Sequence, residues 1–267
     1  QSLSAYLTMT ASHDAVTGGA ASYSLLDIVS TMAWGLGYFG MPHIIIRFMS
    51  LKSEKELRKS SVIGISWTTI ILIMSALTAI AGRLYLGEIE DSSTVFITMV
   101  RRIFPALVSG LLLSAILSAA MSTADSQLLA ASSAFASDVY KPVIRKKASD
   151  SEMLWAGRIV VIVIAVVALM IASDPNSGSI MGLVENAWGV FGAAFGPLML
   201  LCLFWKRTTY QGAIAGMVAG GAMVFFWKLV LKPLGGMFGI YELLPAFVFS
   251  VIVIVAVSLL TAEPDAQ

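Results

Sequence analysis

Apolar residues fill most of this chain in long stretches that short polar segments interrupt. A helix needs about 20 apolar residues to cross a bilayer, so the pattern predicts about seven membrane spans. Their approximate bounds are 24–49, 61–86, 106–139, 153–173, 180–205, 209–231 and 242–261. A shorter apolar run at 94–104 carries Arg101 and Arg102 near its end and stops at Pro105, which predicts an interfacial helix.

The first predicted span should not be one continuous helix. Gly35, Gly37, Gly40 and Pro42 all fall between Trp34 and His43. In a helix interior each Gly costs about 1 kcal/mol relative to Ala, and Pro costs about 3 kcal/mol. Broken backbone at membrane depth is tolerated where it lines a cavity, and in transporters it marks binding sites. This stretch is therefore our first candidate for a substrate site; a kinked, tightly packed helix crossing is the alternative.

Composition places the chain in a membrane and narrows its chemistry. It is 58% hydrophobic and 12% charged, against about 25% charged for a soluble domain, and its mean hydropathy is +0.86. These values predict an all-α polytopic membrane protein whose partner is the lipid bilayer. The net charge of +1 and the lack of a basic stripe argue against nucleic acid. Cys202 is the lone cysteine, and no nucleophile–base pair or metal-ligand cluster is apparent, so we expect no enzyme activity.

The distribution of Lys and Arg predicts the orientation, because cytoplasmic loops are enriched in both. One set of alternate loops and flanks carries Arg47, Lys52, Lys55, Arg58, Lys59, Lys141, Arg145, Lys146, Lys147, Arg158, Lys206 and Arg207. The other set carries Arg83, Arg101, Arg102, Lys228 and Lys232. We therefore expect a multi-pass protein of the cell (inner or plasma) membrane, with residues 1–22 outside and the C-terminus in the cytoplasm.

The third predicted span carries a second candidate site. Ala119, Ser122 and Thr123 are spaced i, i+3 and i+4, so they share one helix face. Two hydroxyl oxygens and a backbone carbonyl could bind a hard cation such as sodium. Small and hydroxyl residues also allow close helix packing, which is the alternative interpretation. Asp125 lies within the same span, and a carboxylate there is a functional hypothesis by default, whether for ion release or for proton coupling. Pairing with a cation on a neighbouring helix is the structural alternative.

Glycines also predict where helices pack closely. Gly212, Gly216 and Gly220 recur every four residues on the sixth predicted span, which is a small-xxx-small packing face. Glu185 and Asn186 near the outer end of the fifth span suggest either an external gate or, as we prefer, a snorkelling pair.

Taken together, the two candidate stretches resemble the solute:sodium symporter family. The run from Gly37 to Ile44, followed by Arg47-Phe48-Met49, is most similar to the sodium/proline symporters of that family. The run Ser118–Leu129 is similar to the family's sodium-site helix. The resemblance covers the whole chain but only the C-terminal half of a family member. It implies a LeuT-type fold, in which 24–205 would be the five-helix second inverted repeat and 209–261 two peripheral helices, all in one transmembrane domain (1–267).

The resemblance also implies roles for individual residues. Ala119 (through its carbonyl), Ser122 and Thr123 would be this half's share of the sodium site. Trp34, Tyr38 and Pro42 would shape proline recognition, although Met41 stands where proline symporters often carry Gln. The N-terminal half of the transporter, with the first repeat, would be the missing partner. A chain that opens on Gln1 also suggests a piece of a longer or processed protein.

The function expected from these residues is sodium-coupled import of L-proline by alternating access, with sodium as the coupling ion. Three alternatives stay open. Met41 leaves room for another small amino acid or carboxylate as substrate, and Asp125 leaves room for coupling to protons. A membrane sensor that keeps a transporter-like body is the third.

Overall fold

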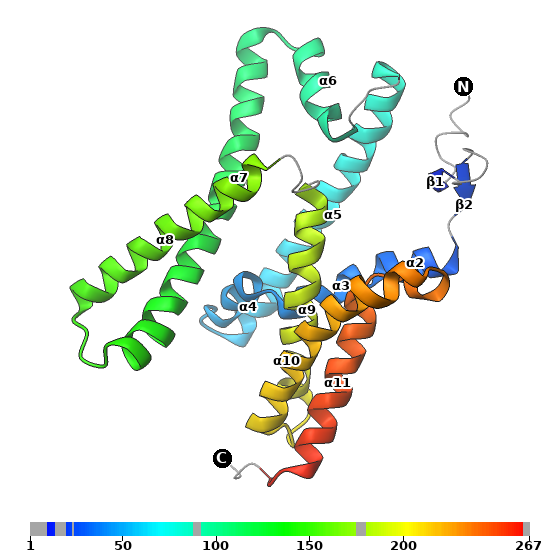
Figure 1. Cartoon of the computed structure of the whole chain (residues 1–267). Helices are drawn as coiled ribbons and strands as arrows, with labels where there is room; N and C mark the ends of the chain where they lie inside the picture. Colours follow the sequence, from blue (N-terminus) through cyan, green and yellow to red (C-terminus); the bar gives the residue numbers. More distant parts are fainter. Residues whose placement is uncertain (1–9, 14–19, 23, 88–91, 175–179, 264–267) are drawn as a thin grey trace. The chain divides into compact units, whose positions relative to one another are not determined.

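The computed structural model describes residues 10–13, 20–22, 24–87, 92–174 and 180–263, and forms two compact units. Unit 1 consists of Gln1–Ile46 and Ile171–Gln267, and unit 2 of Arg47–Met170. Figure 1 traces the whole chain. The first predicted span, as far as Ile46, thus belongs to the same unit as the last three.

Unit 1 combines the broken first span with three long helices. Its N-terminal elements are β1 (Thr10–His13), β2 (Ala20–Ser22), α2 (Leu25–Met32), α3 (Trp34–Gly37), η1 (Tyr38–Gly40) and the start of α4 (Pro42–Met49). Its C-terminal elements are α9 (Ile180–Phe204), α10 (Tyr210–Phe226), η4 (Trp227–Leu231), η5 (Lys232–Leu234), η6 (Gly236–Gly239) and α11 (Leu243–Leu260). The short antiparallel pair of β1 and β2 is a feature that the hydrophobic pattern did not predict.

The core of unit 1 lies where α9, α10 and α11 pack against one another and against α3 and η1 (Figure 1). The predicted glycine face of α10 is confirmed. Gly212, Gly216 and Gly220 are buried, and a methyl group added to Gly220 would lie 3.0 Å from the Cβ of Ser250 in α11. The Ser250 hydroxyl donates a 2.9 Å hydrogen bond to the Gly216 carbonyl. Because these three positions of α10 carry no side chain, α10 and α11 can approach closely, as in other membrane helix pairs.

Unit 2 contains the long helices between the two parts of unit 1 and the short helices that connect them. They are α5 (Glu54–Leu86), η2 (Ser92–Thr94), α6 (Val95–Ile103), α7 (Ala106–Ala134), η3 (Phe135–Ile144) and α8 (Asp150–Ser173), whose last residues belong to unit 1. The predicted short helix at 94–104 is present as α6 and ends before Pro105. The buried Ser109 hydroxyl fixes it to α7, because it lies 3.0 Å from the Val100 carbonyl and 3.1 Å from the Phe104 carbonyl.

Six helices within the described ranges are long and apolar enough to cross a membrane, which supports a polytopic membrane protein. They span Glu54–Leu86, Ala106–Ile144, Asp150–Ser173, Ile180–Phe204, Tyr210–Leu234 and Leu243–Leu260. These correspond to six of the seven predicted spans, although the helix predicted over 61–86 already begins at Glu54. The remaining prediction, 24–49, is divided into short helical pieces, as its glycines and proline indicated.

Candidate functional site

The first span breaks at Met41. The helical turns of α3 and η1 end at Gly40, and Met41 takes an extended conformation with φ −80° and ψ 113°. Pro42 then begins α4, where its fixed φ suits a first helical position and its missing N–H leaves no donor unpaired. The Met41 carbonyl accepts hydrogen bonds from the N–H groups of Ile44 and Ile45, both at 3.0 Å. A new helix N-terminus, with its partial positive charge, therefore opens inside the predicted span.

The glycines around the break form the contact with α9. A methyl group on Gly40 would lie 2.9 Å from both the Gly192 Cα and the Gly196 N, and closer still to the Phe191 carbonyl. One on Gly37 would overlap the Trp188 indole. Real Cβ atoms do not approach this closely, so a side chain at either position would force its neighbours to shift. The tight crossing, which the sequence offered as the alternative to a substrate site, is therefore present, whereas the substrate site stays a prediction.

Four aromatic side chains gather beside this crossing. The Trp34 ring stacks with Trp188, at 6.0 Å between centroids, and with Tyr241, at 5.5 Å. Tyr38 forms a T-shaped pair with Trp188, with 4.9 Å between the ring centroids and 84° between the ring planes. Trp188 also donates a 2.9 Å hydrogen bond from its Nε1 to the Trp34 carbonyl. Stacked and T-shaped pairs at these distances are both favourable, so the cluster fixes the orientation of Trp34.

The three predicted substrate-binding residues differ in their accessibility. Trp34 is half-buried within the aromatic cluster, whereas Tyr38 is 56% exposed and Pro42 is exposed. Trp34 and Tyr38 both contact Trp188, which agrees with their i, i+4 spacing on one helix face. Their role in binding a substrate stays a prediction. Met41, the residue that departs from the family pattern, is buried at the break with 6% of its surface exposed.

The predicted sodium residues lie on α7 and therefore belong to unit 2, whereas the break at Met41 belongs to unit 1. Thr123 Oγ1 donates a 3.2 Å hydrogen bond to the Ala119 carbonyl, one turn earlier. This is the back-bonding common for hydroxyl residues in helices. It also holds two of the three candidate ligand oxygens close together, near enough for one cation to contact both at about 2.3–2.6 Å, the range of hard cation–oxygen bonds. Ala119, Ser122, Thr123 and the alternative candidate Asp125 are all exposed.

A polar network at the start of α11 was not predicted from the sequence. Glu242 is 1% exposed, and its Oε2 lies 2.8 Å from the Lys232 Nζ. The preceding residue, Tyr241, is 4% exposed and donates hydrogen bonds to residues of both α2 and α9. An acidic residue directly before an apolar run was the only sequence signal for this network. It does not identify partners that lie far away in the chain, such as Ser30 and Glu185.

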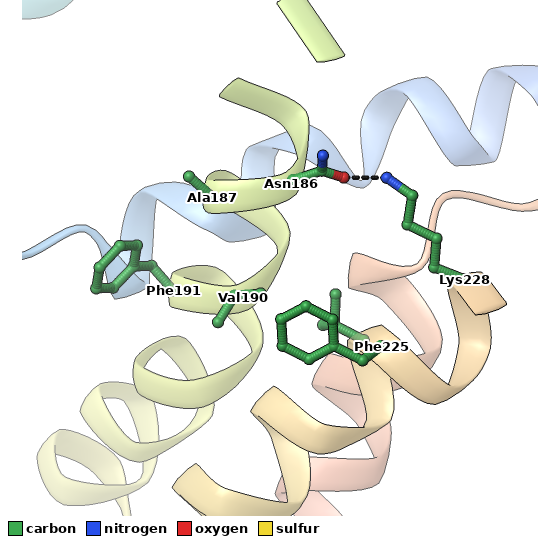
Figure 2. A pocket seen from close by; sticks show the side chains of 7 residues that line it. Asn186, Ala187, Val190, Phe191, Phe225 and Lys228 are labelled. Carbon is green, nitrogen blue, oxygen red and sulfur yellow. Dashed lines mark hydrogen bonds between the residues drawn. The ribbon is translucent and has the colours of Figure 1, made fainter. Parts of the chain in front are cut away.

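A cavity of about 280 Å³ lies between α9 and α10. Figure 2 shows Val190 and Phe225 lining it, with Asn186 hydrogen-bonded to Lys228 at one end. The remaining lining residues are Ala187, Phe191 and Val224. The Asn186 side chain therefore pairs with a lysine, while Glu185 offers its backbone carbonyl to Tyr241. Neither the gate nor the snorkelling interpretation of this pair named these partners.

Comparison with known proteins decides the family. The profile of the family described as "Sodium:solute symporter family" matches residues 3–220. This chain belongs to the sodium:solute symporter family. Members of this family are transporters rather than enzymes, and sodium is their co-transported ion. The resemblance inferred from the two candidate stretches is therefore confirmed.

Individual relatives carry names that specify a substrate. The chain is 44% identical over 245 residues to "Osmoregulated proline transporter OpuE" of Bacillus subtilis, which covers 90% of this chain and 49% of the relative. It is 45% identical over 251 residues to "Sodium/proline symporter 2" of Staphylococcus saprophyticus, with the same two shares. It is 43% identical to "High-affinity proline transporter PutP" of B. subtilis, over 91% of this chain and 51% of the relative. The chain thus spans about half the length of these relatives.

Proposed function

We propose that this chain is part of a sodium-coupled secondary transporter that imports L-proline by alternating access. The observation that carries the proposal is the 43–45% identity, over nine-tenths of the chain, to relatives named as proline transporters. The broken span and the hydroxyl face of α7 supply chemistry that suits such a transporter. No bond is made or broken in the reaction, and its energy comes from the sodium gradient.

The substrate site in this proposal lies at the break in the first span. The N-terminus of α4 attracts the carboxylate of an amino acid through its partial positive charge. Trp34 and Tyr38 offer apolar aromatic surface to the ring of proline, and Pro42 fixes the start of the helix. The cluster with Trp188 holds these rings in place before the substrate arrives, which lowers the entropic cost of binding.

Sodium is the second cargo. The Ala119 carbonyl and the Ser122 and Thr123 hydroxyls would supply its oxygen ligands in this half, and neutral oxygens suit a monovalent cation inside a membrane. Each sodium that moves down a 100 mV potential releases about 2.3 kcal/mol. A tenfold concentration gradient adds about 1.4 kcal/mol. Binding of sodium to the outward-open state shifts the protein toward that state, to the extent that its affinity there is higher.

The whole transporter requires more than this chain. In the proposed LeuT-type arrangement, residues 24–205 form the second inverted repeat and 209–261 two peripheral helices. The N-terminal half supplies the first repeat and the remaining contacts to substrate and ion. The protein lies in the cell membrane with its C-terminus in the cytoplasm, because the loops rich in Lys and Arg then face inward.

A sodium symporter for another small amino acid or carboxylate is the second candidate. It is favoured by one observation, the buried Met41 at the break. Methionine there offers an apolar, flexible side chain without the amide donor and acceptor of glutamine. That difference changes the polarity beside the proposed substrate site and therefore the selectivity of the transporter.

Uptake measurements on the full-length protein in vesicles test both candidates. Radiolabelled L-proline is supplied with an inward sodium gradient, or with choline in place of sodium. The proposal predicts uptake only with sodium, and competition by unlabelled proline. If folded protein takes up no proline under the sodium gradient, the proline assignment is wrong. A screen of other amino acids and small carboxylates under the same gradient then tests the second candidate.

A further inference from the structure

Tyr241 contacts three separate segments of unit 1. Its backbone N–H donates a 2.7 Å hydrogen bond to Ser30 Oγ in α2. Its ring stacks on Trp34 of α3, with 19° between the ring planes. Its hydroxyl donates a 2.7 Å hydrogen bond to the Glu185 carbonyl in α9. The residue thus joins the broken span to α9 from a position between α10 and α11.

The surroundings of Tyr241 hold it in this position. The side chain is almost completely buried, and burial raises the pKa of its hydroxyl still further above neutral pH, where any tyrosine is a protonated donor. The neighbouring Glu242 is paired with Lys232, which secures the start of α11. The hydroxyl lies against α9, because a methyl group on Gly189 would be at van der Waals distance from it, 3.5 Å away. Tyr241 is therefore a fixed support against which the Trp34 ring rests.

We propose that Tyr241 is a positioning residue for the substrate site: it sets the plane of the Trp34 ring and so the affinity for substrate, without touching the substrate itself. This inference rests on the proposed function, because it gives Trp34 a role in binding proline. It adds a residue from the region between the two peripheral helices to the determinants of substrate affinity. Neither a motif nor spacing in the sequence connects residue 241 with residue 34.

Kinetics of the full-length transporter in vesicles test the role. Tyr241→Phe removes the hydroxyl but keeps the stacked ring, and Tyr241→Leu removes both. Tyr210, which is 78% exposed at the start of α10, provides matched controls as Tyr210→Phe and Tyr210→Leu. A neutral hydrogen bond contributes about 0.5–1.5 kcal/mol, which converts to a rise of about twofold to tenfold in the KM for proline in Tyr241→Phe. Tyr241→Leu should raise it more than tenfold, and the Tyr210 variants should leave it unchanged.

Three further readouts separate positioning from a merely structural role. The maximal rate per folded transporter and the half-saturating sodium concentration should stay within twofold of the wild type. In a Trp34→Phe background, Tyr241→Leu should raise KM by less than it does alone, because the two residues act as a unit. An unchanged KM, a loss confined to the maximal rate, or additive effects would overturn the inference.

A spectroscopic measurement makes the test independent of the substrate. In full-length protein labelled with 5-fluorotryptophan, the ¹⁹F resonance that disappears in Trp34→Phe belongs to Trp34. It should shift in Tyr241→Phe and Tyr241→Leu but not in the Tyr210 variants. A shift without any proline uptake by the wild type would mean that the contact is real and that the proposed substrate is wrong. An unchanged resonance would overturn the positioning role whatever the substrate.

Discussion

The indole Nε1 of Trp188 donates a 2.9 Å hydrogen bond to the backbone carbonyl of Trp34. This bond connects α9 to the broken span at the turn that also carries the candidate substrate residues. A partly buried carbonyl that loses its donor keeps its desolvation cost, so the bond should matter more to the fold than its intrinsic strength suggests.

Trp188→Phe should therefore destabilise unit 1 by about 1–3 kcal/mol, since it keeps an aromatic ring but removes the donor. Thermal unfolding of the detergent-solubilised protein measures the effect. Trp227→Phe is the matched control, because the Trp227 indole also donates to a backbone carbonyl, that of Phe238, but in an exposed setting. Equal losses in the two variants would contradict a special role for the bond to Trp34.

The glycines at the break provide a second prediction. Gly40→Ala should disrupt the crossing with α9 and abolish uptake, because the atoms around it are backbone atoms that cannot move aside independently. Gly37→Ala should be less severe, since the Trp188 side chain can shift. Overpacking of this kind typically costs about 1–3 kcal/mol. Gly35→Ala is the control within the same helix: nothing within the described residues lies within 4 Å of an added methyl group. It should leave uptake intact and stability equal or slightly higher, by up to about 1 kcal/mol.

The ion pair Lys232–Glu242 before α11 gives a third prediction: removing one partner should cost more stability than removing the other. Lys232→Met leaves the carboxylate of Glu242 buried without its partner, and breaking a buried pair costs about 3–5 kcal/mol. Because the Lys232 side chain is 35% exposed, solvent screening should reduce this value. Glu242→Gln should cost less, since the lysine can turn toward water. Thermal unfolding of both variants checks the order.

The pair Arg207–Glu263 is the control for that asymmetry. The Arg207 Nη1 and Glu263 Oε1 atoms lie 2.8 Å apart, but the Glu263 side chain is 78% exposed. Exposed pairs contribute about 0–1 kcal/mol, so Glu263→Gln should change the unfolding temperature little. A loss as large as that of Lys232→Met would show that burial is not the cause.

The sequence predicted the elements of the fold better than their contacts. Long apolar runs identified six continuous helices, and the glycines and Pro42 identified the broken one, because both signals are local. The glycine spacing on α10 identified a packing face for the same reason. The partners of Trp34 could not be predicted, since Trp188 and Tyr241 follow it by more than a hundred residues and no local pattern specifies such pairs. The relative importance of Ala119, Ser122 and Thr123 depends on an ion, which neither the spacing nor the contacts within α7 reveal.

A set of Thr123 variants tests that sodium role. Thr123→Val keeps the shape of the side chain but removes the oxygen, whereas Thr123→Ser keeps the oxygen. If Thr123 binds sodium, Thr123→Val should raise the half-saturating sodium concentration of proline uptake at least tenfold, and Thr123→Ser should restore most of the affinity. Thr78→Val on α5 is the matched control, because Thr78 Oγ1 donates to the Met74 carbonyl at 2.7 Å just as Thr123 does to Ala119. If Thr123→Val leaves the half-saturating sodium concentration as unchanged as Thr78→Val does, both hydroxyls serve only their own helices. Proton coupling through Asp125 is then the alternative, which Asp125→Asn tests.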